Sequence, residues 1–245
     1  MGKAAFMVNS SSSPRTRTAS RHPGSSGVFV DLSHEIVPGA TAYPGLPQPV
    51  LTDHISREQS RASYAPGTEF HLGMVCMMGQ TGTYIDVPHH RYADGYDLAA
   101  LDLARVAHVP VTVVDTDRRE IPPETFAGAE LTGRAVLIRT GWSRHWGTDT
   151  YGSGRHPHLS AASAALLAEA EPAVVGIDST NIDDTTGRER PAHTRLLGAG
   201  IPLVEHLTNL SGVPARDGWF TAVPVKFAGL GTFPVRAFLQ TDRGA

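Results

Sequence analysis

The chain has 245 residues, a formal net charge of −3, 40% hydrophobic and 18% charged residues, which is ordinary for a globular protein that buries a core. It has no basic run and nothing near the roughly 18 consecutive apolar residues of a membrane helix, so we expect neither nucleic acid nor membrane as a partner. The single cysteine, Cys76, excludes an internal disulfide and favours a reducing, cytoplasmic location. Because it lies in an apolar run, we expect an inert, buried thiol.

The chain begins with a segment that we interpret as a disordered arm, residues 1–26, because it is rich in Ser, Arg and Gly and almost lacks hydrophobic residues. Residues 27–245 are expected to form one domain. A strand is predicted over 28–34, followed by an irregular loop over 38–49. This loop contains Tyr43, whose ring a stiff Pro-Gly turn could present to a pocket.

The stretch Gly79–Asp94, GQTGTYIDVPHHRYAD, concentrates coordinating and titrating groups on little backbone. It holds the carboxylate of Asp86 and the adjacent imidazoles of His89 and His90. An apolar run, Leu72–Met78, precedes it and is predicted to be a buried strand. A rigid strand that delivers such a loop is typical of a functional site.

The rest of the chain alternates strands with helical segments. Strands are predicted over 109–114, 134–140, 173–178, 201–204, 219–225 and 233–239, and helical segments over 97–104, from 122, over 160–170 with Ser160 as N-cap, and over 193–197. The polar loop 142–157 carries several aromatic residues, among them Trp142, and could form a pocket wall. The order of elements predicts one strand-rich α/β domain.

Three strand ends carry potential metal ligands: Asp86 with His90, Asp178 with Asp183 and Asp184, and His193 with Glu205. One histidine and two carboxylates are a common ligand set for a catalytic divalent ion such as zinc or manganese. Such an ion polarises a carbonyl and lowers the pKa of bound water, and a nearby histidine can move the proton. Alternatively, these carboxylates only cap loops. The chain has no G-x-S-x-G elbow and no phosphate-binding glycine loop.

Residues 80–90, QTGTYIDVPHH, resemble the signature H-x-G-T-H-x-D-x-P-x-H of the cyclase family, which includes bacterial kynurenine formamidases and isatin hydrolases. The spacing is kept throughout. The resemblance extends to the segments Asp31-Leu32-Ser33, Tyr43-Pro44-Gly45 and Gly176-Ile177-Asp178, and to the twelve-residue spacing of His193 and Glu205. It implies a swivelling β/β/α fold, assembly as a homodimer or homotetramer, and a divalent metal site.

By position, the resemblance assigns metal ligation to Asp86, His193 and Glu205 and proton transfer to His90. Gln80 and Tyr84, however, stand where the family has its two motif histidines. A glutamine carbonyl is a weak ligand, and a tyrosine binds metal well mainly as phenolate, with a reference pKa of about 10. The resemblance therefore implies one divalent ion, zinc or manganese, or none.

Three functions follow from this ligand set. The first is a hydrolase that resembles kynurenine formamidase, in which metal-activated water attacks an amide or lactone bond of a small aromatic substrate. The second is a metal-independent aromatic polyketide cyclase or dehydratase that uses His90 and Tyr84. The third is a catalytically silent small-molecule-binding protein, although the retention of every ligand apart from the two motif histidines argues against it. Candidate substrate contacts are Gln80, Tyr43, His89 and Trp142.

Overall fold

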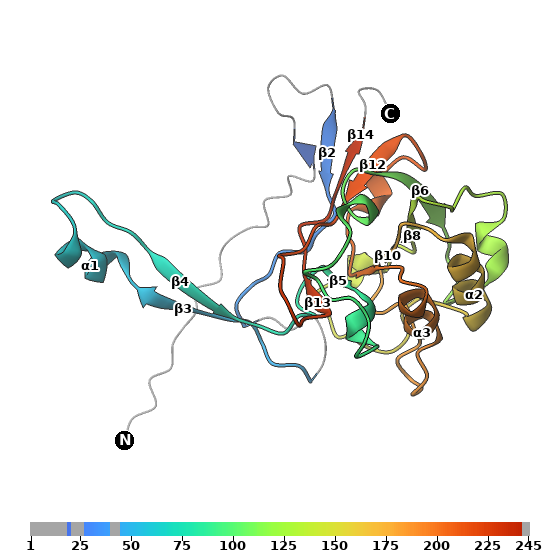
Figure 1. Ribbon diagram of the computed structural model, residues 1–245, viewed down its shortest axis with the longest axis horizontal. Coiled ribbons are helices and arrows are strands. Elements are labelled where there is room, and N and C mark those ends of the chain that lie inside the picture. The colour runs from blue at the N-terminus through green and yellow to red at the C-terminus, as the bar shows by residue number, and fades with distance from the viewer. Residues whose placement is uncertain (1–18, 21–26, 40–44, 242–245) are drawn as a thin grey trace.

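A mixed sheet of ten strands forms the body of the molecule in the computed structural model, which describes residues 19–20, 27–39 and 45–241 (Figure 1). Its strands are β1 (Ala19–Ser20), β2 (Val28–Asp31), β5 (Tyr84–Asp86), β6 (Val109–Asp115), β8 (Ala135–Arg139), β10 (Val174–Ile177), β11 (Leu203–Glu205), β12 (Gly218–Thr221), β13 (Thr232–Pro234) and β14 (Phe238–Thr241). Their order across the sheet is β1-β2-β14-β12-β6-β8-β10-β11-β5-β13.

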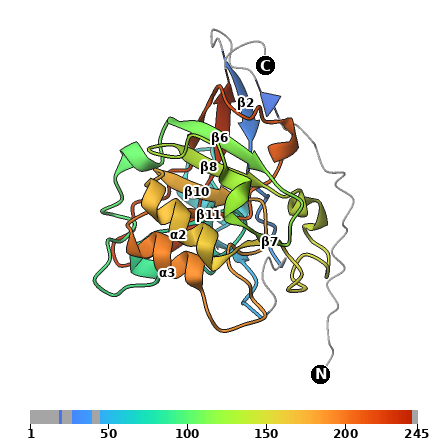
Figure 2. The same cartoon turned by 90° about the vertical axis from the view of Figure 1, so that its right-hand side faces the viewer.

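The centre of this sheet is parallel, from β6 through β8 and β10 to β11, and is apolar on both faces. Val136 and Ile138 of β8 pack in one core cluster, and the alternate Ala135 and Leu137 pack in the other. Helices α2 (Ala161–Ala170) and α3 (Pro191–Gly198) cover one face of the sheet (Figure 2). Burial on both faces explains why these strands have continuous rather than alternating apolar sequences.

Smaller elements complete the described part of the chain. They are the strand pairs β3 (Val50–Ile55) with β4 (Leu72–Cys76) and β7 (Glu120–Ile121) with β9 (His158–Leu159), the helix α1 (Arg57–Ser60), and the 3-10 turns Arg61–Ser63, Pro88–His90, Leu103–Arg105, Pro123–Phe126, Trp142–His145 and Leu210–Gly212. The strand-rich α/β domain predicted from the sequence is confirmed. None of the helices in these described segments is long and apolar enough to cross a membrane.

The best-predicted helix is α2. Ser160 caps it as expected, because its Oγ accepts a hydrogen bond from the backbone N–H of Ser163 at 3.1 Å. The helix predicted over 97–104 is wrong, since only a 3-10 turn forms at its end. Asp97 and Asp102 accept hydrogen bonds from the backbone two or three residues ahead, and such local bonds compete with a helix. The strand predicted over 233–239 is divided into β13 and β14.

The apolar run before the central motif is a strand, but it is not buried. β3 and β4 form a hairpin that projects away from the body with α1 near its far end (Figure 1). Every residue of β4 is exposed in the single chain, including Cys76. The expectations of a buried strand and a buried thiol are therefore wrong for the isolated chain, because this hairpin has no second layer to pack on.

The predicted disordered arm, residues 1–26, falls mostly outside the described residues. Two of its residues form β1, which pairs with β2 in antiparallel register. Tyr43, a predicted pocket residue, also lies outside the described part of the chain.

Candidate active site

The short strand β5 positions the first two functional side chains, Tyr84 and Asp86. These residues are two positions apart, so their side chains leave the same face of the strand. β5 lies between β11 and β13, and the register sets Tyr84 opposite Glu205 and Asp86 opposite Thr232. Strand pairing therefore brings Glu205 next to Tyr84 and Asp86, although Glu205 is far from them in sequence.

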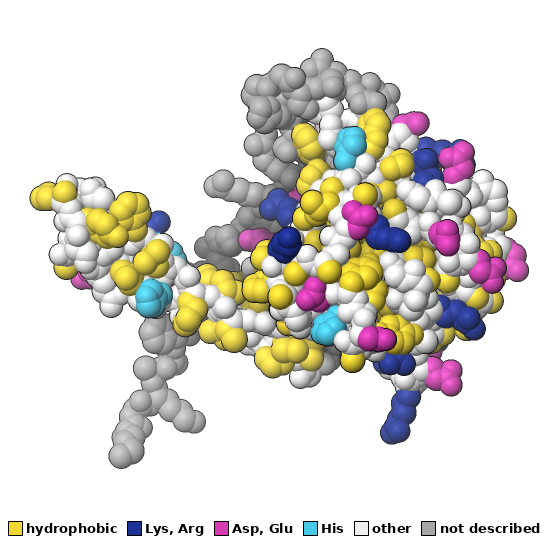
Figure 3. Space-filling view, in the orientation of Figure 1, with side chains coloured by type: hydrophobic (Ala, Val, Ile, Leu, Met, Phe, Trp, Pro, Cys, Tyr) yellow, Lys and Arg dark blue, Asp and Glu magenta, His cyan; other side chains and the backbone are white. Residues whose placement is uncertain are grey.

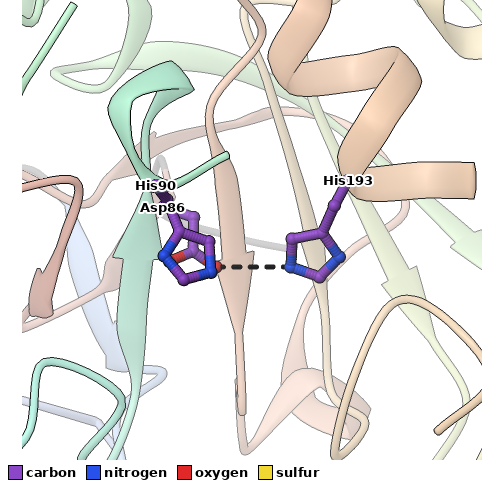
Figure 4. Close-up of side chains that lie close together, drawn as sticks. All are labelled: Asp86, His90 and His193. Carbon is purple, nitrogen blue, oxygen red and sulfur yellow. Dashed lines mark ion pairs between the residues drawn. The ribbon is translucent and has the colours of Figure 1, made fainter. Parts of the chain in front are cut away.

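The carboxylate of Asp86 is fully buried, and one of its two oxygens accepts a hydrogen bond. Its Oδ1 accepts a hydrogen bond from the hydroxyl of Thr232. Its Oδ2 is buried and makes no hydrogen bond, and it lies 3.6 Å from Nε2 of His193, the ion pair drawn in Figure 4. Burying a carboxylate oxygen without a hydrogen-bond donor is energetically unfavourable, so a cation next to Oδ2 would stabilise Asp86.

His193 reaches this point from α3 and is held there by Asp183. Oδ2 of Asp183 lies 2.7 Å from Nδ1 of His193, and the same carboxylate accepts hydrogen bonds from the backbone N–H groups of Ala192 and His193. Nδ1–H thus donates to Asp183, and Nε2 faces Asp86. Burial lowers the pKa of His193, but the hydrogen bond to Asp183 and the nearby charges of Glu205 and Asp86 outweigh it and raise the pKa to about 10.

His90 lies in the 3-10 turn that follows β5, at the mouth of the site, with a third of its side chain exposed. Its Nδ1 is 2.9 Å from Oγ1 of Thr232. Thr232 gives its one hydroxyl proton to Asp86, so it accepts from Nδ1–H of His90, and this network assigns the free lone pair of His90 to Nε2. Gly231 permits this packing, because a Cβ there would lie 2.1 Å from the backbone N of His90.

Glu205 is fully buried, and hydrogen bonds satisfy both of its oxygens. Oε1 accepts from the backbone N–H of Ile182 at 2.6 Å, and Oε2 accepts from the hydroxyl of Tyr84. Burial raises the pKa of Glu205 to about 7, although these two hydrogen bonds oppose the shift. Oε1 also lies 3.9 Å from Nε2 of His193. The hydroxyl of Tyr84 and the backbone of Ile182 thus occupy one oxygen of Glu205 each.

The donor set fits one divalent cation. Asp86, His90 and His193 each offer a ligand atom within 4.8 Å of the others. Two further buried carboxylates, Asp183 and Glu205, surround the same imidazole of His193. Buried carboxylates in excess of buried cations are strongly unfavourable. In the metal-free chain a proton on His193 offsets part of this charge, and a divalent ion would offset more of it.

Aromatic rings line the wall next to this centre: His34, Tyr84, Trp146, Tyr151 and His206. Trp146 stacks on His34 with 3.8 Å between ring centroids, and His206 lies 5.0 Å from Tyr84. Burial lowers the pKa of His34 to about 3 and that of His206 to about 4, so both imidazoles are neutral near pH 7. Tyr84, Tyr151 and His206 are buried and meet their neighbours edge to face, whereas the stacked pair His34 and Trp146 is partly exposed and uncharged, which suits contact with a planar ring.

The other residues predicted for the site have different positions. Gln80 and His89 are half-buried on either side of β5. Trp142 lies behind the aromatic wall, where its Nε1–H donates to the carbonyl of Tyr151 and the hydroxyl of Thr180. Asp178 lies elsewhere, because its carboxylate accepts hydrogen bonds from the N–H groups of Thr140 and Gly141 and the Thr140 hydroxyl.

Several residues of this centre gave no usable signal in the sequence. Thr232 lies 146 positions from its partner Asp86, and Gly231 stands in an ordinary glycine-rich turn. Asp183 was one of three acidic residues in the same loop, with nothing to single it out. His34 and His206 followed predicted strands and could have been found, because polar residues at strand ends are site candidates.

The fold and this centre define a strand-rich α/β protein with a carboxylate–histidine site of the kind that binds a divalent metal. Comparison with known proteins identifies its family. Residues 30–184 match the Cyclase family, so the chain belongs to the cyclase family, as the sequence motif predicted.

Two curated relatives span nearly the same length. The chain is 30% identical over 214 residues to a kynurenine formamidase of Bacillus mycoides, covering 86% of this chain and 97% of the relative. It is 27% identical over 219 residues to a kynurenine formamidase of Polaromonas naphthalenivorans, covering 86% and 87%. The fold is similar to isatin hydrolase A from Labrenzia aggregata bound to benzyl benzoate, with a TM-score of 0.74, 23% identity and coverage of 89% and 95%.

Proposed function

We propose that this protein is a metal-dependent hydrolase that cleaves an amide or lactone bond in a small aromatic substrate. The observation that carries the proposal is the convergence of Asp86, His90 and His193, with Asp183 orienting His193 so that its Nε2 faces the centre. The names of the curated relatives, kynurenine formamidase, support the reaction class.

One zinc or manganese ion is the cofactor that we propose, held by Asp86 and His193 with Glu205 beside them. When bound, such an ion supplies a water whose pKa falls to about 7, which makes hydroxide available at neutral pH. Asp183 keeps the ring of His193 in the tautomer that binds metal, a carboxylate–histidine arrangement common around catalytic ions. Thr232 holds Asp86 and His90 in one network.

We assign proton transfer to His90. Its Nδ1–H donates to Thr232, so Nε2 is the basic nitrogen, and the partly exposed ring stands at the entrance of the site. From there it can accept a proton from attacking water and return it to the leaving amine or alcohol. The aromatic wall around Trp146 would contact the ring of the substrate, with Gln80 and His89 as further contacts in the proposal.

The alternative, a metal-free cyclase with Tyr84 as proton donor, is less well supported. The hydroxyl of Tyr84 donates to Glu205 inside the protein, so its proton is engaged away from the mouth of the site. The silent binding protein is also disfavoured, because it would have no use for the network of Asp183, His193 and Asp86.

Metal removal and reconstitution test the proposal. Protein purified without chelators should contain about one divalent ion per chain and hydrolyse an arylformamide or an aromatic lactam. Activity should disappear after dialysis against a chelator and return with zinc or manganese, and His193→Ala should lose both ion and activity. Chelator-treated protein that keeps full activity, and loses it on Tyr84→Phe, would instead show a metal-independent reaction that depends on Tyr84 and would exclude the metal-dependent hydrolase.

We also propose that the protein acts as a homodimer through the projecting hairpin β3–β4. Its strands expose Val50 and Met74 on one face and Leu51 and Val75 on the other. Hydrophobic side chains are visible in yellow along the side of the arm that faces the viewer in Figure 3. A two-stranded hairpin without a packing layer is marginal in water. Burying these half-exposed apolar side chains against a second chain would supply an apolar centre for an interface, which in a stable complex covers roughly 800 Å² per protomer.

We propose that a second copy of the chain covers this surface, because one two-fold symmetric contact would bury the hairpins of both chains. Light scattering should show two chains for the wild type. Leu51→Asp should give one chain, while Arg118→Asp, a change of charge at an exposed position outside the hairpin, should not. A wild-type mass of one chain would exclude the dimer. We further propose a cytoplasmic location, where the exposed thiol of Cys76 on this arm stays reduced.

A further inference from the structure

An open hollow of about 820 Å³ lies beside α3, on the outer side of the elements that carry the candidate active site. Four arginines line it: Arg91, Arg188, Arg190 and Arg195, together with one acidic residue, Glu189. Arg91 directly follows His90 in sequence, and Arg195 lies two positions after His193. Basic side chains are visible along the lower edge of the body, beneath α3, in Figure 3.

Positive charge exceeds negative charge among the described residues that line this hollow. None of the four arginines forms an ion pair with a carboxylate there. Arg190 donates only to the backbone carbonyls of Asp184, Gly187 and Glu189, and the guanidinium of Arg91 lies 5.4 Å from the ring centroid of Tyr92. Arginines elsewhere are commonly paired with carboxylates: Arg57, Arg61, Arg119, Arg134, Arg139, Arg216 and Arg236.

The concentration of charge is notable because the whole chain is acidic. Four guanidinium groups and one carboxylate leave a formal charge of +3 in the hollow (4 − 1), whereas the net charge of the chain is −3. Like charges gathered without partners repel one another, so the arrangement costs free energy in the free protein. A bound polyanion removes this repulsion and gains charge-assisted hydrogen bonds.

We propose that this hollow binds a small molecule with a multiply charged phosphate group. Guanidinium groups bind phosphate oxygens through paired N–H donors, and four arginines line this hollow. The volume lies within the range of small-molecule sites, roughly 300–1,000 Å³. The basic residues line one hollow rather than an extended stripe, which distinguishes this surface from a nucleic-acid-binding face.

The position of the hollow gives the bound phosphate a route to affect the active site. α3 presents His193 to the inside and Thr194 and Arg195 to the hollow. The hydroxyl of Tyr92 donates to the carbonyl of Thr194 at 2.8 Å, so α3 is tied to the segment that carries His90 and Arg91. A ligand that bridges Arg91 and Arg195 would span both segments that hold the metal ligands.

Calorimetric titration of the full chain with pyrophosphate and with adenosine diphosphate, at 150 mM NaCl, tests the proposal. We expect one site per chain for at least one probe and an affinity that falls at least tenfold in Arg195→Gln and in Arg188→Gln. Arg118→Gln is the matched control, because Arg118 is exposed and lies outside the hollow. Each variant alters an exposed side chain, and its unfolding temperature without ligand verifies the fold.

Several results would overturn the proposal. The proposal is wrong if neither probe binds, or if Arg118→Gln weakens binding as much as Arg195→Gln does. Binding that His193→Ala abolishes while Arg195→Gln leaves it intact would place the phosphate on the metal centre instead. Because the titration needs no turnover, its outcome is independent of whether the protein hydrolyses an amide or a lactone.

Discussion

Gly231→Ala is the substitution for which the structure gives the sharpest expectation. The added Cβ would lie 2.1 Å from the backbone N of His90 and 2.5 Å from its Cα, whereas carbon atoms in proteins essentially never approach backbone closer than 3.0 Å. The two segments must therefore separate by about 1 Å. Because the next residue, Thr232, holds both Asp86 and His90, this separation acts directly on the network of the site.

The expected magnitude follows from that displacement. A shift of about 1 Å in a catalytic group lowers turnover on the order of 100-fold. Overpacking a tight contact costs about 1–3 kcal/mol, and each kcal/mol lowers the unfolding temperature by roughly 2–4 °C in a chain of this size. We therefore expect kcat/KM for an arylformamide to fall about 100-fold in Gly231→Ala, with a moderate loss of thermal stability.

Gly212→Ala provides the matched control, since a Cβ at Gly212 meets no atom within 4 Å. It should keep the activity and unfolding temperature of the wild type. The steric reasoning would be refuted if Gly231→Ala matched Gly212→Ala in both measurements. If Gly231→Ala lost stability but kept full activity, the role that we assign to His90 would be wrong.

Other perturbations separate the parts of the site. Asp183→Asn removes the carboxylate that orients His193, so metal affinity measured by competition with a chelator should fall about 10–100-fold. Tyr84→Phe leaves an oxygen of buried Glu205 without its hydroxyl donor and should lower the free energy of unfolding in denaturant by about 1–3 kcal/mol. At the surface, an arginine hydrogen bond lowers the pKa of Asp115. Asp115→Asn should therefore cost stability above pH 4, the range of the unfolded carboxyl, and the difference from wild type should vanish as pH falls below the lowered pKa. This last effect should be small because the side chain is mostly exposed.

The sequence predicted the body of the fold because its signals are local. The apolar runs that became β6, β8 and β10 are buried on both faces, and a run of this kind reads as a strand without knowledge of its neighbours. The cap of α2 is a contact between residues three apart. The exposed hairpin misled the prediction, since an apolar sequence alone does not show whether another element of the chain covers it.

The site residues within the sequence motif were predictable, whereas the contacts that strand pairing creates were not. Asp86 and His90 stand in one short segment whose spacing is informative. Thr232 comes to them only because β13 pairs with β5, and Glu205 meets Tyr84 only because β11 pairs with β5. No pattern within either segment encodes that register.

The structure gives a physical account of Tyr84, which the sequence analysis set at the position of a motif histidine. Glu205 is buried, and a carboxylate there requires either a cation or hydrogen-bond donors. The hydroxyl of Tyr84 and the backbone of Ile182 supply donors to both oxygens, so this carboxylate is stabilised without a second ion. Asp86 has no such donor on Oδ2, which faces His193. The chain therefore stabilises the carboxylate of Glu205 with hydrogen bonds, whereas Oδ2 of Asp86 would be stabilised by a bound cation. This is the arrangement expected of a site for a single metal ion.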